Sequence, residues 1–248
     1  MHYTLLVYIM APRLMLFASE LAACLGKNPY CSQDEIAMKL LKREAPTIYA
    51  EKLLQNGEEI FDALPESEKK TLADGIGQTD TATSVLENTK KAMQALDALE
   101  IDTDKKEKLR KHVRSVHATD FGERKEDVTK KVSENRGDNI RKDNKFVKRI
   151  LRNVNGIDVL VGGRCDGITS NGDIIEIKNR VKGFRGLTEY EKIQLLAYMY
   201  IIGSNNGTLV ESYNGETREY HIEWDKSEWD SLIDNLNKFI ELYMEYLV

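Results

Sequence analysis

Two acidic residues and a lysine lie close together in the segment 163–180, whose sequence is GRCDGITSNGDIIEIKNR. Asp166 comes first, and Glu176 and Lys178 follow within an apolar run. One residue separates Glu176 from Lys178, so both side chains point to the same face of a strand. Two carboxylates can hold a divalent cation, and a neighbouring ammonium group can orient an attacking water. These residue types at this spacing are the minimum for metal-dependent cleavage of a phosphodiester bond.

The surroundings of the three residues favour a ligand site over the alternative, which is ordinary surface charge. Glu176 and Lys178 interrupt the apolar run IIEIK, and two charges on one face of such a strand are costly unless a ligand uses them. Glycines lie on both sides of Asp166 and let a ligand come close to the backbone. We therefore interpret the segment as a β-hairpin that carries a candidate metal site.

The second half of the chain alternates between helical and strand patterns. The first predicted elements are a helix over 122–137, which Gly137 ends, and three strands over 145–154, 157–168 and 173–181. A helix over 188–203 follows, with Gly203 as its C-cap. The last elements are a strand pair over 207–214 and 217–224 and a terminal helix over 225–248. The dipeptides Asn155-Gly156, Asn171-Gly172 and Asn214-Gly215 predict tight hairpin turns. The order is helix, three strands, helix, strand pair, helix.

The first half is predicted to be helical. A short helix over 19–25 ends at Gly26, and Ser32 with Glu35 forms a capping box that begins the next helix. From 46 to 117 the apolar residues recur at helical spacing and no strand pattern is convincing. We predict N-terminal helices in 1–45 that pack on the core, a helical lobe over 46–118, and the core itself over 119–248.

Length and composition indicate a globular protein of one large domain, or a core with an inserted lobe. The chain has 248 residues, 41% of them hydrophobic and 31% charged, with four prolines and no low-complexity tract. The three cysteines are too few for a four-cysteine iron–sulfur cluster and lack metal-site spacing. We therefore expect free thiols in a reducing compartment, either the cytoplasm or, for a viral protein, the host nucleus, and not secretion.

The apolar segment 1–23 raises the question of a signal peptide or membrane segment. Its beginning has no Lys or Arg, and Arg13 and Glu20 interrupt the apolar run. We expect a buried N-terminal segment and no membrane association, with a signal peptide as the alternative. Met10 is an alternative start of the natural chain.

The net charge of -5 conceals three sectors of different sign. Acidic residues outnumber basic ones by 13 to 5 over 51–104 and by 10 to 3 over 205–248, whereas basic residues outnumber acidic ones by 17 to 8 over 105–152. The basic sector directly precedes the candidate metal site. Its placement favours a phosphate-binding surface over the alternative, a solvated helical face.

These motifs resemble the PD-(D/E)XK nuclease superfamily, and within it the lambda-exonuclease/YqaJ-like viral recombinases and their RecB-type relatives. The hairpin motif matches as Asp166, Glu176 and Lys178, with Cys165 at the position of the superfamily's proline. The family's other motifs match as Gln194-Leu-Leu-Ala-Tyr198, as FGERKE with Glu126 as an additional acid, and as ASELAACLGKNPY with Ser19 at the serine position. The likeness covers the N-terminal helices and nearly everything from Phe121 onwards.

The resemblance implies an α/β restriction-endonuclease-like core, a mixed central sheet flanked by helices, with a helical lobe. It implies one or two Mg²⁺ or Mn²⁺ ions held by Asp166, Glu176, the Ile177 carbonyl and Glu126. Lys178 would orient or deprotonate the attacking water and offset the charge of the transition state, and Gln194 would position the lysine or the phosphate. The alternative for Glu126 is an exposed helical acid, and that for Gln194 is a surface position.

The resemblance also suggests contacts to DNA. The candidates are Ser19, Arg13, Arg164, Asn179, Arg180 and Tyr198. Each basic or polar candidate has a structural alternative: Ser19 as a helix cap, and Arg164 and Arg180 as partners of nearby acids. Arg13 would act as a 5′-phosphate clamp, although its offset from Ser19 does not match the family arginine. Tyr198 is as well explained by core packing.

We therefore expect a metal-dependent deoxyribonuclease, with an exonuclease that resects double-stranded DNA ends in phage or viral recombination as the first choice. The family often works beside a single-strand annealing protein and forms closed rings, which adds both as expectations. The alternatives are a structure-specific or nicking endonuclease on the same core and a non-catalytic DNA-binding protein. RNA as a substrate also stays open, because the metal-site residues do not contact the sugar.

Overall fold

The computed structural model describes residues 13–51, 56–74, 76, 81–134, 140 and 145–247, without the side chains of 51 and 123–134. It begins with a strand that the sequence did not predict, β1 (Arg13–Phe17), followed directly by α1 (Ala18–Cys24). Leu14 and Leu16 on β1 and Leu21 on α1 are buried, as expected for this apolar segment. Residues 1–12 lie outside the described part of the chain.

The first sheet has the order β1-β3-β2 and is mixed. Its other strands are β2 (Val147–Val154) and β3 (Ile157–Gly163), which pair antiparallel, while β1 runs parallel to β3. Asn155 (φ 51°) and Gly156 (φ 83°) both adopt the left-handed conformation that a two-residue turn of this kind requires, which confirms the predicted turn. Parallel pairing places the end of β1 and the end of β3 at the same edge of the sheet.

The second sheet has the order β4-β5-β6-β7 and carries the predicted motif. Its strands are β4 (Gly167–Ile168), β5 (Ile174–Asn179), β6 (Asn206–Tyr213) and β7 (Glu216–Glu223). The predicted strand over 157–168 is thus two strands in two sheets, since the chain leaves β3 after Gly163 and pairs again only at Gly167. The Asn171-Gly172 turn is also longer than predicted, because only Gly172 has a positive φ (88°) and its N–H bonds the Thr169 carbonyl.

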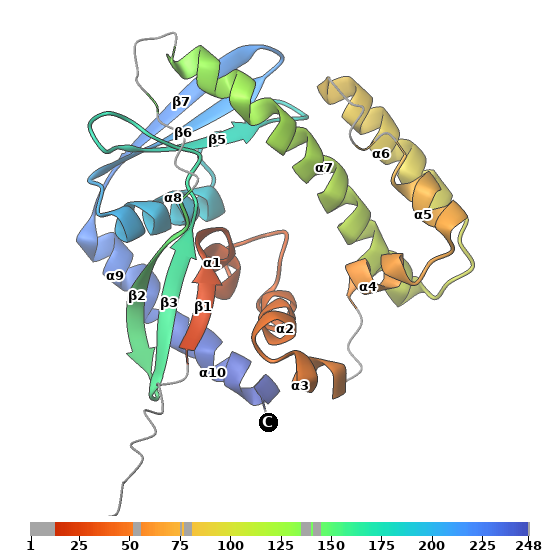
Figure 1. Ribbon diagram of the computed structural model, residues 1–248, viewed down its shortest axis with the longest axis horizontal. Coiled ribbons are helices and arrows are strands. Elements are labelled where there is room, and N and C mark those ends of the chain that lie inside the picture. The colour runs from red at the N-terminus through yellow and green to blue at the C-terminus, as the bar shows by residue number, and fades with distance from the viewer. Residues whose placement is uncertain are drawn as a thin grey trace, which may run out of the picture.

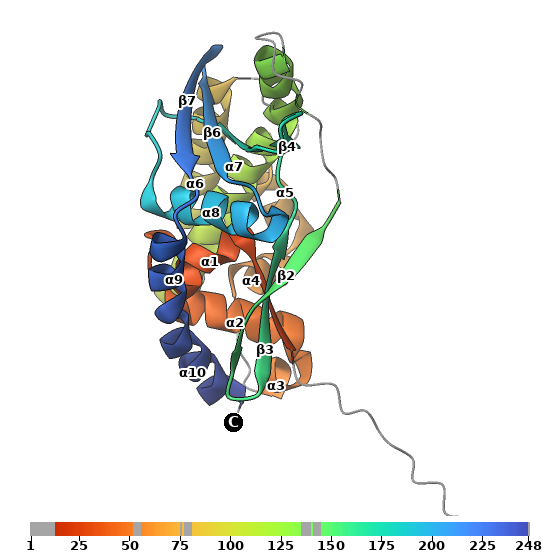
Figure 2. The ribbon, with the colours of Figure 1, turned by 90° about the vertical axis from the view of Figure 1, so that its left-hand side faces the viewer.

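Helix α8 (Glu189–Ile202) lies between the two sheets in both views (Figures 1 and 2). It connects β5 to the parallel strand β6, and Gly203 ends it in the left-handed conformation, as predicted. The helix comes so close to β6 that a methyl group at Gly207 would lie 2.8 Å from the Met199 sulfur. This close packing fixes which residues of α8 face the motif strand.

A helical lobe extends from one side of the core. It contains α4 (Gly57–Asp62), α5 (Glu66–Leu72), α6 (Ala82–Asp97) and the first part of α7 (Thr103–Glu134). Leu72, Leu96 and Leu109 belong to a small apolar core of its own. Figure 1 shows α7 running from the lobe to the second sheet as one helix, so it passes through residue 118, where the sequence suggested a boundary. The predicted stop at Gly137 lies outside the described residues.

The remaining helices cover the first sheet and complete the main core. They are α2 (Gln33–Glu44), α3 (Pro46–Glu51), α9 (Lys226–Asp234) and α10 (Leu236–Leu247). The predicted capping box of α2 is confirmed, with the Ser32 N–H 2.8 Å from the Glu35 carboxylate. The predicted terminal helix is divided at Asn235 into α9 and α10. Mixed sheets flanked by helices confirm the predicted α/β class, with the strands divided between two sheets where one central sheet was predicted.

Candidate active site

The β4–β5 hairpin brings Asp166 to the carboxylate of the motif strand. Gly167 pairs with Ile175, so Asp166, directly before β4, lies beside the middle of β5. Its Oδ2 accepts a hydrogen bond of 2.7 Å from the Ile177 N–H. Asp166 comes ten positions before Glu176 in the sequence. The fold nevertheless places the Asp166 carboxylate against the backbone of Ile177, the residue directly after Glu176.

Lys178, Glu176 and Gln194 form one hydrogen-bonded group. The Lys178 ammonium donates to Glu176 Oε1 at 2.7 Å and to Gln194 Oε1 at 3.3 Å. The Gln194 amide nitrogen, from α8, donates to the same Glu176 oxygen at 2.8 Å. The Glu176 side chain is only 4% exposed, whereas that of Lys178 is 26% exposed. The predicted triad and its glutamine thus converge, with the lysine on the accessible side.

Electrostatic interactions with Glu176 and Asp166 shift the pKa of Lys178. Burial lowers the pKa of Lys178, but the charge and hydrogen bond of Glu176, together with the charge of Asp166, outweigh it and raise the pKa above its usual range. Lys178 is therefore an ammonium ion near neutral pH. It can donate hydrogen bonds and stabilise negative charge, which favours the orienting role predicted for it over proton abstraction.

Tyr198 lies behind this group, as the packing alternative predicted. A methyl group at Gly163 would lie 2.8 Å from the Tyr198 ring, so only glycine fits at the end of β3. Burial raises the pKa of Tyr198, and the nearby charges of Glu176 and Asp166 raise it further. The tyrosine therefore stays neutral and lines the site from within, away from solvent.

The oxygen donors of the site suit a hard divalent cation. Asp166, Glu176 and the Ile177 carbonyl lie on two adjacent strands and offer the ligands that Mg²⁺ and Mn²⁺ prefer. Position 126 falls on α7, but the Glu126 side chain is outside the described residues. Among the described side chains, no group of three or more His, Cys, Asp and Glu could hold a metal ion. A complete ligand set would need a donor beyond Asp166 and Glu176.

The predicted DNA contacts divide into residues near the site and residues away from it. Arg164 is exposed directly before the hairpin, and Ser19 is exposed on the first turn of α1, where the N-cap is Phe17 and not the serine. Asn179 donates to the Gly122 carbonyl of α7 at 3.0 Å. Arg13 lies opposite Asp158 in the pairing of β1 with β3, at the end of β3 that is away from the hairpin. This position is about 16 Å along the strand, so Arg13 lies apart from the other predicted DNA contacts.

Arg180 is not available to a phosphate group, contrary to its interpretation as a DNA contact. Its guanidinium donates two hydrogen bonds to Glu191, at 2.7 and 3.0 Å, and a third to Glu211. All three residues are buried. The fold therefore uses Arg180 to neutralise two carboxylates between β5, β6 and α8, which is the structural alternative considered for it.

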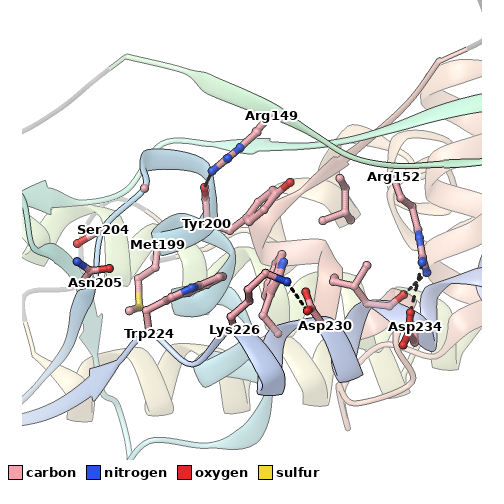
Figure 3. Close-up of a pocket in the computed structure, with 14 residues that line it drawn as sticks. Arg149, Arg152, Met199, Tyr200, Ser204, Asn205, Trp224, Lys226, Asp230 and Asp234 are labelled. Carbon is pink, nitrogen blue, oxygen red and sulfur yellow. Dashed lines mark hydrogen bonds and ion pairs between the residues drawn. The ribbon is translucent and has the colours of Figure 1, made fainter.

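A pocket of about 670 Å³ lies on another side of α8 (Figure 3). Tyr200, Trp224 and Trp229 form its aromatic wall, with Tyr200 and Trp229 stacked 4.9 Å apart. Its arginines are already engaged: Arg149 donates to the Tyr200 carbonyl at 2.8 Å, and Arg152 to the Ile233 carbonyl at 2.9 Å. Asp166, Glu176, Lys178 and Gln194 do not line it. The hydrogen-bonded group at the hairpin is therefore separate from this pocket.

The sequence contained a signal for a residue that shares a helix face with the site. Tyr190, Gln194 and Tyr198 are spaced four residues apart, which places them on one face of α8. Tyr190 lies one turn before Gln194 and donates to the buried Glu191 at 3.1 Å. Glu191 and Glu211 were missed as partners of Arg180 because ion pairs between distant segments leave no local pattern.

Comparison with known proteins gives similarity in fold only. No family model matches the chain, and no curated protein matches it. The solved structure "Crystal structure of SSO0001" is similar with a TM-score of 0.50 at 15% identity, covering 94% of this chain and 78% of that one. At this identity the likeness concerns the fold.

Two structures of one further protein were found at lower scores. An alkaline exonuclease (LHK-Exo) from Laribacter hongkongensis is 15% identical with a TM-score of 0.41, covering 77% of this chain and 95% of that one. LHK-Exo in complex with dAMP is 14% identical with a TM-score of 0.40, covering 72% of this chain and 89% of that one.

Within the described residues, no helix is long and apolar enough to cross a membrane.

Proposed function

We propose that this chain is a metal-dependent nuclease with its catalytic centre at Asp166, Glu176 and Lys178. The observation that carries the proposal is the shared hydrogen-bonded group, in which the Lys178 ammonium lies 2.7 Å from a buried Glu176 oxygen and Gln194 bonds both. A strongly buried carboxylate beside a lysine that remains partly accessible is costly for a fold and suits a site that handles a phosphate group.

The proposed cofactor is one or two Mg²⁺ or Mn²⁺ ions bound by Asp166, Glu176 and the Ile177 carbonyl, with Glu126 as an additional ligand. When bound, such a cation lowers the pKa of a coordinated water and offsets charge on the phosphate. Lys178 would donate a hydrogen bond to the water or to a phosphate oxygen. Gln194 would hold the Lys178 and Glu176 side chains in their relative positions. Tyr198 would keep water from the buried side of the site.

The proposed substrate is DNA, with resection of double-stranded ends as the first choice. Support comes from the basic sector 105–152, which directly precedes the hairpin in the sequence, and from the family resemblance of the motifs. The expectations of a ring-shaped oligomer and of a single-strand annealing partner rest on that resemblance alone. Gel filtration of the purified protein tests the first.

One assay tests the activity and distinguishes its forms. The protein is incubated with Mg²⁺ and linear duplexes labelled at either end, with and without a 5′-phosphate, beside closed circular DNA. We expect nucleotides to be released from the linear DNA, no release in EDTA, and loss of activity in Asp166→Ala. Asp158→Ala is the matched control, because Asp158 lies at the other end of β3 and bonds only Asn153 among the hydrogen bonds described for it.

The outcomes separate the alternatives. Nicking of closed circles would replace the exonuclease with an endonuclease on the same centre. DNA binding without any Mg²⁺-dependent cleavage would leave a non-catalytic DNA-binding protein. Cleavage that Asp166→Ala and Asp158→Ala reduce equally would place the centre elsewhere and contradict the proposal. A labelled RNA duplex of the same sequence tests the preference for the sugar.

A further inference from the structure

A row of side chains leads from the catalytic group to the surface along one face of α8. Tyr198 is buried against Gly163, Gln194 bonds Glu176 and Lys178, and Tyr190 is half-buried one turn further towards the start of the helix. The row continues beyond α8, since the Tyr30 ring lies edge-on to the Tyr190 ring with centroids 5.8 Å apart. Tyr30 belongs to the loop between α1 and α2.

Tyr30 is highly exposed and yet held in place. It is 65% exposed, the largest exposure among the large apolar side chains that the structure describes. A single exposed aromatic residue needs no functional explanation by itself. Here, however, a segment far away in the chain holds the ring, because the Tyr190 ring packs against it at a right angle and the Arg185 guanidinium donates to its hydroxyl at 3.2 Å.

The loop that carries Arg185 is itself fixed. It follows the motif strand β5, and its backbone N–H groups at Arg185 and Gly186 each donate to the buried Glu211 carboxylate at 3.1 Å. Glu211 is in turn bonded to Arg180. The buried ion group thus sets the position of an exposed arginine seven residues after Lys178. Lys27 and Lys182 are exposed on the same two loops, with Lys27 paired to Glu189.

We propose that Tyr30 and Arg185 form a nucleic-acid contact site beside the catalytic centre, in which the Tyr30 ring stacks on a base and Arg185 binds a backbone phosphate. An exposed, preorganised aromatic face next to a guanidinium suits a base and its phosphate, because every base has a face that can stack. The inference rests on the proposed nuclease function for the identity of the ligand, and it assigns roles to Tyr30, at the end of the segment ASELAACLGKNPY, and to Arg185, which lies in none of the quoted motifs.

The geometry gives the register of the contact. One turn of α8 from Gln194 to Tyr190 is about 6 Å, and the next ring centroid lies 5.8 Å further. Laid end to end, the two steps total about 12 Å, which corresponds to about three or four base steps along one strand of duplex DNA. The stacked base should therefore lie within about four positions of the phosphate that is cleaved.

Photocrosslinking in EDTA tests the stacking without requiring cleavage. Duplexes carry 5-iodouracil at successive positions from one end, and crosslinked peptides are identified by mass spectrometry. We expect crosslinks to Tyr30 within a window of one or two positions, retained by Tyr30→Phe and lost in Tyr30→Leu. Crosslinks that spread evenly over positions, or that avoid Tyr30 altogether, would overturn the proposal.

Salt-dependent binding tests the role of Arg185. We expect Arg185→Ala to weaken DNA binding about tenfold and to reduce the slope of log K against log salt by about 0.9, as for one lost phosphate contact. Tyr30→Leu should weaken binding about tenfold with the slope unchanged. Lys238→Ala, an exposed cation on α10, is the matched control with no expected change. An unchanged slope in Arg185→Ala would contradict the phosphate contact.

These results are independent of the nuclease test. Mg²⁺-dependent cleavage with no Tyr30 crosslink and unchanged affinities would refute the contact site and leave the nuclease. Crosslinks to Tyr30 in a protein that cleaves no nucleic acid would support the contact site and refute the catalytic proposal.

Discussion

Lys178 lies on β5 and Arg180 follows directly after the end of that strand, and their surroundings differ in one decisive respect. The Lys178 ammonium bonds one carboxylate and one amide, and its side chain remains 26% exposed. The Arg180 guanidinium bonds two carboxylates, and its side chain is 8% exposed. The Lys178 ammonium keeps donor capacity for a ligand, whereas two carboxylates of the protein balance the charge of the Arg180 guanidinium. Spacing in the sequence could not tell these two roles apart.

The difference separates a lysine that a ligand could reach from an arginine that holds the fold together. Arg180 joins β5 to α8 through Glu191 and to β6 through Glu211. Buried ion groups of this kind often add little net stability compared with an apolar replacement, but losing one partner is strongly destabilising. We therefore expect changes at Lys178 to affect activity and changes at Arg180 to affect folding.

The largest expected effect is on activity. Lys178→Met removes the only described ammonium of the catalytic group and keeps the length of the side chain. We expect the single-turnover rate of DNA cleavage with Mg²⁺ to fall by about 10²–10⁴-fold, since a charge that stabilises the transition state is lost. Gln194 still bonds Glu176, so circular dichroism and the unfolding midpoint should change little. An unfolded variant would instead place Lys178 among the structural cations.

The next effect is on stability. Arg180→Met leaves two buried carboxylates without their guanidinium, and we expect the free energy of unfolding in urea to fall by about 3–5 kcal/mol. The control is Lys27→Met, which removes a surface ion pair with Glu189 and should cost at most about 1 kcal/mol. If Arg180→Met instead folds normally and binds DNA more weakly, the original interpretation of Arg180 as a phosphate contact is restored.

The smallest effect concerns pH. Burial raises the pKa of Glu191, but hydrogen bonds from Arg180 and Thr188 outweigh it and lower the pKa below the usual 4.5. A lowered pKa in the folded state stabilises the fold above the unfolded pKa, and this contribution is lost as pH falls through the folded value. We expect the difference in free energy of unfolding between the wild type and Glu191→Gln to shrink below about pH 4.5.

Urea titrations at several pH values between 7 and 3.5 measure that difference. Glu189→Gln is the control, because its carboxylate is exposed and paired only at the surface, where such pairs contribute little. A difference between the wild type and Glu191→Gln that stays constant over the whole range would show that Glu191 is not held as a charged partner of Arg180.

Local signals explain what the sequence predicted of the fold. Asn155-Gly156 and Asn214-Gly215 adopt positive φ in the structure, and few other dipeptides do so at low cost. Ser32 with Glu35 and Gly203 after α8 likewise satisfy backbone groups at helix ends, so their positions are readable. Strand β1 was missed because its four apolar residues after Arg13, directly before a helix, have no period of their own.

The candidate site likewise contains some residues that local sequence signals reveal and others that they do not. Glu176 and Lys178 were predictable because alternation along a strand fixes their common face. Asp166 was predicted from its place in the hairpin beside glycines and Gln194 from motif resemblance, and the structure places both against that pair. The charge balance of Arg180 and the distance of Arg13 depend on segments far apart in the chain. Such long-range pairing has no local pattern, so only the folded arrangement reveals it.

Helix α7 connects the outlying lobe mechanically to the motif strand. Its 32 residues extend about 48 Å, and they include both the apolar contacts of the lobe and Gly122, whose carbonyl accepts the Asn179 hydrogen bond next to Lys178. A stiff rod of this length acts as a lever, so even a small tilt of the lobe moves the far end by several ångströms. A load bound to the lobe would thus act on the strand beside Lys178 without touching it.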